Sequence, residues 1–311
     1  MIEIVNDYKK ASFGGSIKNA ISFSSKLGEM AMRVSRNKLD ARYDSQIRKH
    51  IEKMNSGKFR IFRHIYIETI NRCNGGCRFC HANRFTDKRE MELMDEGLLE
   101  KILKELKEME FKGWISFHRN NEPFLDKRIF DFVKMMRESM PDALINIHSN
   151  GTLLNIEKIY RIMPHLSFLN INNYNDKLEL HDNIRETVEH FNRTNEFDGL
   201  IKVCLRKENE ILLNRASSAP NRKMGYTMKS PCLYPFEQLN VCSNGNISIC
   251  CNDAFEDVVL GNAGEQTLEE IWHGEKFKDI RDKMLMDRNL IKICGKCDII
   301  TPPTRNPNEN D

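Results

Sequence analysis

Cys73, Cys77 and Cys80 form a Cys-x3-Cys-x2-Cys motif directly after residues 63–70, which alternate in polarity and are rich in β-branched and aromatic side chains. This pattern predicts a strand that leads into a loop. Three thiolates in one loop suit an iron–sulfur cluster better than a disulfide or a zinc ion. Because a four-iron cluster normally takes four cysteines, the motif leaves one iron open to a small chelating molecule.

The residues around the motif support a cluster site. Gly75 and Gly76 allow the loop backbone to wrap closely around a bound group. A zinc site completed by His81 is the alternative. However, Cys80 and His81 are neighbours in the sequence and are poorly placed to bind one tetrahedral ion together.

The motif, with the aromatic Phe79 directly before its third cysteine, resembles the signature of radical S-adenosylmethionine (SAM) enzymes. The resemblance implies a 4Fe-4S cluster on the three cysteines, with SAM chelating the open iron through its amino and carboxylate groups. In that family, one-electron reduction cleaves SAM to methionine and a 5′-deoxyadenosyl radical, which abstracts a substrate hydrogen atom. By position, Phe79 would pack near the adenine of SAM, and ordinary loop packing is the alternative.

A polar segment after a later strand resembles a second element of the family's SAM site. Asn120, Asn121, Glu122 and Pro123 stand where relatives commonly carry Gly-Gly-Glu-Pro, a loop that binds the amino group of SAM. Asparagine tolerates left-handed backbone geometry, so it is a reasonable replacement for glycine. An ordinary strand-to-helix turn is the alternative.

Two further positions resemble SAM contacts of the family. Ser149 and Asn150, followed by Gly151, resemble its Thr-Asn-Gly element, whose polar side chains face the ribose or the carboxylate. Arg206 ends a later predicted strand, and its guanidinium matches the geometry of the SAM carboxylate. A surface arginine is the alternative for Arg206.

Strand-like and helix-like patterns alternate after the cysteine loop. Strands are expected at 114–118, 144–148, 166–171 and 200–205, and helices at 98–109, 129–140, 155–164 and 178–193. This alternation favours an α/β fold with a parallel sheet covered by helices. It fits the partial (β/α)6 barrel of the radical SAM family, in which ligands sit at the carboxyl ends of the strands.

The C-terminal third carries a second group of cysteines. Residues 241–250 predict a β-hairpin around Asn244-Gly245, and Thr267 and Glu270 predict a capping box at the start of a helix. A complete four-thiolate set is available from Cys232, Cys250, Cys294 and Cys297. The arrangement resembles the shortened SPASM region called twitch, which implies one auxiliary 4Fe-4S cluster. A zinc ion on the same four thiolates is the alternative.

Cys251 directly follows one of these expected ligands. Successive strand residues face opposite sides, so Cys251 should point away from the auxiliary cluster. One class of radical SAM epimerase quenches its substrate radical with a hydrogen atom from a cysteine, and Cys251 is a candidate for that catalytic role. Packing of a buried thiol is the alternative.

The expected parts are a helical extension over 1–58, the barrel over 59–225, the auxiliary cluster domain over 226–300 and a mobile polar tail over 301–311. Within the extension, helical patterns cover 17–34 and 40–55, and we expect these helices to pack against the barrel. No convincing strand precedes residue 58, so a winged-helix domain is not expected.

Composition narrows the setting. The net charge of +3 gives no case for nucleic-acid binding. No apolar run approaches the roughly 20 residues that span a bilayer, and no secretory signal is recognisable. The ten cysteines cluster at metal-ligand spacings, which indicates a reducing compartment. We therefore expect a cytoplasmic protein.

The expected reaction is oxidation or epimerisation of a sugar, an aminocyclitol or a related small molecule. This expectation comes from the single auxiliary cluster, which resembles that of aminocyclitol dehydrogenases in the family. Residues 214–222 form a polar loop that is placed either to contact such a substrate or to serve as a linker. A maturase of peptide or protein side chains is the alternative. Either enzyme needs a reducing partner such as flavodoxin or ferredoxin.

Overall fold

The structure is a computed structural model that describes residues 1–6, 8, 26–54, 61–222 and 228–303. Within these residues, the centre of the molecule is a nine-stranded sheet in the order β1-β6-β5-β4-β3-β2-β7-β8-β9. The strands from β1 to β7 pair in parallel, and β8 and β9 continue the sheet antiparallel. This confirms the expected α/β fold with a partial barrel and a C-terminal hairpin.

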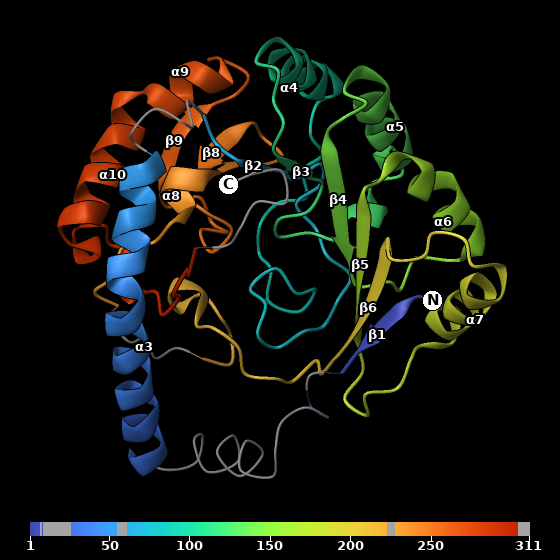
Figure 1. Cartoon of the computed structure of the whole chain (residues 1–311), viewed down its shortest axis with the longest axis horizontal. Helices are drawn as coiled ribbons and strands as arrows, with labels where there is room; N and C mark the ends of the chain where they lie inside the picture. The colour runs from blue at the N-terminus through green and yellow to red at the C-terminus, as the bar shows by residue number, and fades with distance from the viewer. Residues whose placement is uncertain (7, 9–25, 55–60, 223–227, 304–311) are drawn as a thin grey trace.

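The barrel alternates strands and helices as predicted. Its strands are β2 (His64–Ile67), β3 (Trp114–Ser116), β4 (Leu144–Ser149), β5 (Phe168–Tyr174) and β6 (Ile201–Arg206). Its helices are α4 (Glu96–Glu108), α5 (Ile129–Ser139), α6 (Ile156–Ile162) and α7 (Asp182–Thr194). Figure 1 shows these helices around the outside of the curved sheet.

The two faces of the sheet differ in chemistry. Ile65, Ile115 and Ile145 are paired across β2, β3 and β4 and are completely buried in the core. Because neighbouring strand residues face opposite sides, His64 and Ser116 lie on the other face, where His64 Nε2 and Ser116 Oγ are 2.6 Å apart. The sheet therefore packs an apolar face against the helices and turns polar groups toward the barrel interior.

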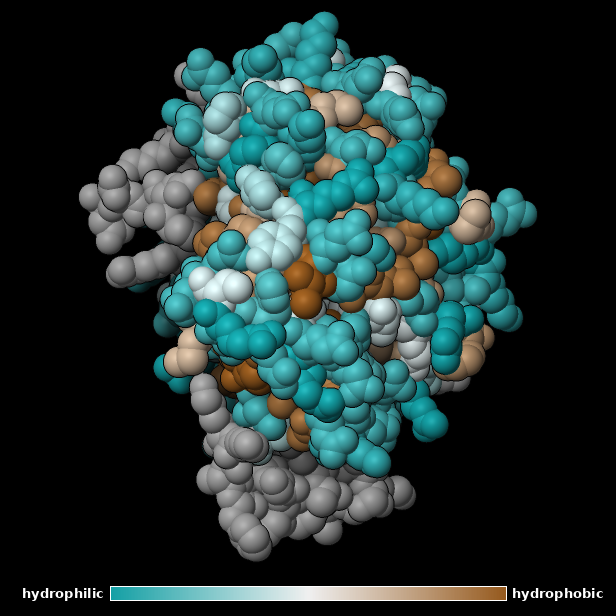
Figure 2. Space-filling model, turned by 90° about the vertical axis from the view of Figure 1, so that its right-hand side faces the viewer, coloured by the Kyte–Doolittle hydropathy of each residue, from teal (hydrophilic) through white to brown (hydrophobic). Residues whose placement is uncertain are grey.

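The outer helices turn their polar sides to solvent. Figure 2 shows that the face on the side of α6 and α7 is mostly hydrophilic, with small apolar areas between the polar side chains. Within the described part of the chain, no helix is both long and apolar enough to cross a membrane.

The N-terminal region differs from the expectation in two respects. β1 (Glu3–Val5) pairs in parallel with β6, although only helices were expected before residue 58. A strand of three residues is too short to produce a recognisable pattern. The described helix there, α3 (Lys26–Lys53), is continuous where two helical stretches were predicted, and residues 9–25 and 55–60 lie outside the described residues.

α3 contacts the barrel, as expected, where His50 Nε2 lies 3.4 Å from the guanidinium of Arg63 before β2, and it also packs against the C-terminal region. The Asp40 carboxylate accepts a hydrogen bond from the backbone N–H of Ser230 at 3.0 Å. Arg48 donates to the carbonyl of Leu285 at 3.1 Å. Figure 1 shows α3 beside α10 (Glu275–Met286).

The auxiliary region continues the barrel sheet. It comprises α8 (Tyr234–Glu237), β7 (Gln238–Val241), β8 (Asn246–Ser248), β9 (Val259–Asn262), α9 (Leu268–His273) and α10. β7 pairs in parallel with β2, so one strand of the predicted hairpin also extends the barrel. Gly245 takes the left-handed conformation (φ +83°) that the Asn-Gly turn requires.

The helical part of this region was predicted only approximately. Both hydrogen bonds of the Thr267–Glu270 capping box are present, as predicted. The expected single helix is two helices, because Gly274 is extended between α9 and α10. The chain stays fixed up to Thr301, which is buried and whose hydroxyl accepts from the N–H of Leu233 at 2.8 Å. Thr301, the first residue of the expected tail, is therefore packed against the rest of the protein, and residues 304–311 lie outside the described residues.

Candidate active site

A cavity of about 210 Å³ opens at the carboxyl ends of the parallel strands. Cys73, Cys77 and Cys80 line it. Six of the residues expected at SAM also line it: Phe79, Asn120, Asn121, Glu122, Ser149 and Asn150. Pro123, Arg206 and Cys251 are not among the lining residues. The structure thus brings the cysteine loop and most of the expected SAM contacts to one place.

The three thiols fit a metal cluster. Burial raises the pKa of the Cys73 thiol to about 12. Burial, together with the neighbouring Cys80 and Cys73, raises the pKa of Cys77 well above its ordinary value. A Cβ atom at Gly75 would lie 3.4 Å from Sγ of Cys73 and 3.8 Å from Sγ of Cys77, so glycine keeps the space beside these sulfurs free. Iron would supply the positive charge that holds such thiols as thiolates.

His81 is unavailable as a fourth ligand. Its Nε2 is hydrogen-bonded to Asn120 Oδ1 at 2.8 Å, and its Nδ1 to Ser218 Oγ at 3.1 Å. Both ring nitrogens of this buried histidine are therefore occupied. The zinc site completed by His81 does not fit this geometry.

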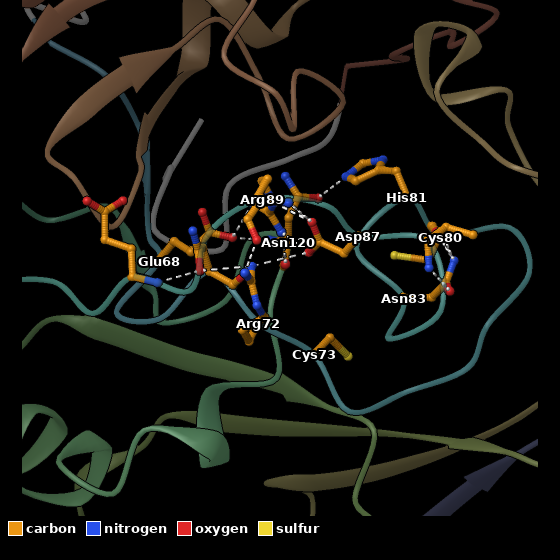
Figure 3. A network of polar contacts seen from close by, with 12 residues as sticks. Glu68, Arg72, Cys73, Cys80, His81, Asn83, Asp87, Arg89 and Asn120 are labelled. Carbon is orange, nitrogen blue, oxygen red and sulfur yellow. Dashed lines mark hydrogen bonds and ion pairs between the residues drawn. The ribbon is translucent and has the colours of Figure 1, made fainter.

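A buried ionic network supports the cysteine loop. Arg89 pairs with Asp87 at 2.8 Å and with Glu68 at 3.7 Å. The amide of Asn83 donates to the carbonyl of Cys80 at 2.5 Å. Figure 3 shows the network running from Glu68 at the end of β2 to Asn83 beside Cys80. The loop is thus anchored at both ends before any ligand binds.

Glu122 organises the next two strand ends. Its carboxylate accepts from Ser149 Oγ at 2.8 Å and from the backbone N–H of Asn150 at 2.7 Å. Burial raises the pKa of Glu122 to about 7, although these hydrogen bonds act in the opposite direction. The Asn150 amide in turn lies 3.8 Å from Sγ of Cys73. Glu122 therefore connects the predicted SAM loops to the cluster loop.

Asn121 is the lining residue best suited to hold a polar ligand. Its side-chain Nδ2 is buried and has no hydrogen-bond partner among the described residues. A buried amide donor without a partner is unfavourable. A carboxylate or hydroxyl oxygen of a bound ligand would satisfy it.

Arg215 lines the cavity, whereas the expected Arg206 does not. The guanidinium of Arg206 is held by Glu210, with Nε and Oε1 2.8 Å apart. Arg215 lies close enough to the thiols of Cys80 and Cys251 for both to raise its pKa, against the effect of burial. Arg215, Ala216 and Ser217 all have positive φ angles, and such strain often occurs at binding sites. The polar loop at 214–222 was the only signal for Arg215 in the sequence.

The four expected auxiliary thiols also come together. Burial raises the pKa of Cys250 well above its ordinary value, and the neighbouring thiols of Cys251, Cys294, Cys232 and Cys297 add to the rise. β8 ends at Ser248, so the strand alternation that was expected to turn Cys251 away does not reach Cys250 and Cys251. Burial likewise raises the pKa of Cys297, to about 11. The four expected ligands therefore lie near one another, although Cys232 and Cys297 are far apart in the sequence.

Arg288 lies near these thiols, and no sequence motif marks it. It is 1% exposed, it donates to the carbonyls of Ser230 and Ile299, and its Nε has no partner among the described residues. Its charge opposes the rise in pKa of Cys232 and Cys294. A buried guanidinium is unfavourable without negative charge nearby. Four thiolates around an iron–sulfur cluster provide that charge.

Arg288→Gln is expected to shift the midpoint potential of the auxiliary cluster to more negative values by tens of millivolts. Reduction adds negative charge, and the nearby guanidinium stabilises that charge. Potentiometric titration followed by electron paramagnetic resonance (EPR) measures the shift. Lys283→Gln on α10 is the control because Lys283 is exposed and pairs with Asp279. Equal potentials in the wild type and Arg288→Gln would contradict the assignment.

Histidines also reach the cavity, and they were not expected. His118 follows β3 and His148 lies on β4, and both line the cavity. Their rings are stacked with centroids 4.1 Å apart and planes 8° apart. Polar residues at alternate positions of predicted strands are the signal that could have identified them.

Comparison with known proteins agrees with this geometry. Residues 67–197 match the family model of the radical SAM superfamily, and residues 232–298 match SPASM, an iron–sulfur cluster-binding domain. The curated S-adenosyl-L-methionine-dependent 2-deoxy-scyllo-inosamine dehydrogenase of Niallia circulans is 28% identical over 257 residues. That match covers 79% of this chain and 96% of the relative.

Solved structures show the same fold. The crystal structure of BtrN in complex with AdoMet and 2-DOIA superposes with a TM-score of 0.65 at 25% identity, covering 77% of this chain and 94% of BtrN. BtrN in an open conformation gives a TM-score of 0.56 at 23% identity, with 76% and 92% coverage. This chain is therefore a radical SAM enzyme with a C-terminal SPASM iron–sulfur domain.

Proposed function

We propose that this enzyme oxidises a secondary alcohol of an aminocyclitol, or of a similar polyhydroxylated small molecule, to a ketone. The observation that carries the proposal is the match to the 2-deoxy-scyllo-inosamine dehydrogenase, which extends over nearly the whole of that relative. The polar cavity wall supports it, because Asn121 and Arg215 offer hydrogen-bond donors to hydroxyl groups. A flavodoxin or a ferredoxin is the proposed electron donor.

Two groups of cysteines would hold the two clusters of the enzyme. Cys73, Cys77 and Cys80 would hold the first cluster, and the four C-terminal cysteines would hold the auxiliary one. When bound, the first cluster with SAM supplies the radical that removes a carbon-bound hydrogen atom, and the auxiliary cluster supplies an electron acceptor. Arg215 lies near the thiol of Cys80 in the motif and near the thiol of Cys251, which directly follows the expected auxiliary ligand Cys250, and its guanidinium would orient substrate oxygens.

Deuterium transfer tests the proposal. The substrate is 2-deoxy-scyllo-inosamine with deuterium on the carbon that carries the oxidised hydroxyl. The reduced, cluster-loaded enzyme is expected to release deuterated 5′-deoxyadenosine and one ketone per SAM cleaved. Mass spectrometry detects both products. Unlabelled 5′-deoxyadenosine without ketone would contradict the proposal and would lead to the peptide-maturase alternative.

Cys251→Ala is expected to form the ketone at the wild-type rate. Oxidation needs no hydrogen-atom donor, and Cys251 is not among the residues that line the cavity. Chromatography of the products after anaerobic turnover measures ketone and any epimer. An epimer that the wild type makes and Cys251→Ala does not would favour epimerisation, with Cys251 as the hydrogen donor.

A further inference from the structure

Alcohol oxidation needs a group that accepts the hydroxyl proton, and the described cavity wall offers few. Arg119 and Arg215 are cations and have no proton-accepting atom. The Tyr174 hydroxyl is a weak base, and burial raises its pKa so that it stays protonated. The three thiols of the motif are assigned to the cluster. Among the described lining residues, Glu122, His118 and His148 remain.

Glu122 is already committed to the protein. Its two oxygens accept hydrogen bonds from Ser149 Oγ, from the backbone N–H of Asn150 and from the backbone N–H of Phe124. It is 1% exposed. A proton on Glu122 would weaken the hydrogen bonds that shape the SAM loops, because a neutral carboxyl group accepts hydrogen bonds less strongly than a carboxylate does.

His118 is committed as well. Its Nδ1 accepts a hydrogen bond from the backbone N–H of His148 at 3.1 Å. The neutral ring therefore carries its proton on Nε2. A second proton would have to enter at Nδ1, where it would face the N–H of His148.

His148 is the remaining candidate. Its side chain is open to the cavity, and no side-chain or backbone hydrogen bond to its ring nitrogens is present among the described residues. Its ring is held flat against His118, which is itself in edge contact with Tyr66 at 5.6 Å between centroids. Loss of bulk water around the ring lowers the pKa of His148 to about 4. The ring is therefore neutral at physiological pH and has a nitrogen free to accept a proton.

We propose that His148 accepts the hydroxyl proton of the substrate during oxidation, and that the stacked His118 positions its ring. The inference rests on the proposed alcohol oxidation. His148 is the catalytic residue in this assignment, and His118 is a positioning residue.

The chemistry balances as follows. Conversion of a secondary alcohol to a ketone breaks one C–H bond and one O–H bond and forms the second C–O bond. The carbon loses a hydrogen atom to the 5′-deoxyadenosyl radical, the oxygen loses its proton to His148, and one electron leaves to an oxidised iron–sulfur cluster. The hydroxyl of the carbon-centred radical gives up its proton as the electron leaves, so without a base the electron stays on the substrate radical.

The test compares the cluster-loaded wild type with His148→Ala, His148→Gln and His273→Ala. His273 is an exposed histidine at the end of α9 and serves as the control. With carbon-deuterated 2-deoxy-scyllo-inosamine, both His148 variants are expected to keep deuterium transfer into 5′-deoxyadenosine. Ketone formation is expected to fall about 10²–10⁴-fold, the usual contribution of a general base. Free imidazole is expected to restore ketone formation in His148→Ala only.

Two readouts do not depend on ketone formation. The dissociation constant of the substrate, measured by calorimetry on the unreduced loaded enzyme, is expected to be unchanged in His148→Gln. In frozen reaction samples, EPR spectroscopy is expected to show a carbon-centred substrate radical accumulating in the His148 variants.

Wild-type ketone rates in both His148 variants would overturn the assignment. Joint loss of deuterium transfer and ketone, with no rescue by imidazole, would also overturn it, because His148 would then serve only to position the substrate. Failure of the proposed function looks different, since the wild type itself would then transfer no deuterium from this substrate. That outcome would overturn both the proposed function and the role of His148.

Discussion

Cys77→Ala is expected to abolish 5′-deoxyadenosine formation and to remove about four irons per chain from the roughly eight of the reconstituted wild type. Cys77 is one of three thiols that line the cavity, and the neighbouring His81 cannot replace it, because both of its ring nitrogens are bonded. Iron and sulfide analysis and chromatography of anaerobic reactions measure the two effects.

Two matched variants make this result specific. Cys204→Ser is expected to keep the full iron content, because Cys204 lies on β6 and its thiol donates to Asn170 Oδ1 at 3.5 Å. Cys250→Ala is expected to lose about four irons while still cleaving SAM, because it removes only an auxiliary ligand. A Cys77→Ala enzyme that cleaves SAM at the wild-type rate would show that the motif does not hold the reactive cluster.

Arg119→Met is expected to lower the free energy of unfolding by about 3–5 kcal/mol, because it leaves a buried carboxylate without its main partner. The side chains of Arg119 and Glu68 are 0% and 1% exposed, and the guanidinium lies 3.1 Å from the Glu68 carboxylate. Arg119 also donates to Ser248 Oγ and to the Asp253 carbonyl, both at 2.6 Å. It therefore connects the barrel to the auxiliary region. Anaerobic urea unfolding of the loaded protein measures the change.

Arg161→Met is the control for this measurement. Arg161 and Asp131 form an ion pair of the same length, 3.1 Å, but their side chains are 55% and 71% exposed. Such pairs contribute about 1 kcal/mol or less. Equal destabilisation by Arg119→Met and Arg161→Met would show that the buried pair has no special role in joining the two regions.

The parts of the site that could be predicted are those formed by residues that lie close together in the sequence. The three ligands of the first cluster lie within one short loop, so their spacing alone indicates the coordination. The same holds for the Thr267–Glu270 capping box, whose two hydrogen bonds are present. The alternation of strands and helices was recognisable because each element buries one regular apolar face.

Residues that act across long sequence separations were missed or misplaced. Arg206 ends β6 and Arg215 follows it, and only the ion pair of Arg206 with Glu210 shows which of them is left to face the cavity. Arg288 belongs to no sequence motif, yet it lies near the thiol of Cys232, which is far from it in the sequence. The sequence also gave no signal of what β1 contacts or of the packing of α3 against the C-terminal region. A short strand such as β1 pairs wherever an open sheet edge is available.

The sequence by itself determined the chemistry of this protein, because the two cysteine groups and their spacings specify a radical SAM cluster and an auxiliary cluster. Only the tertiary structure decided which side chains of the cavity beside the first cysteine group are available to a substrate. His148 is left as a proton acceptor because His118 and Glu122 are occupied by hydrogen bonds from other segments. A side chain's availability depends on partners that folding brings together, and no local pattern records those partners.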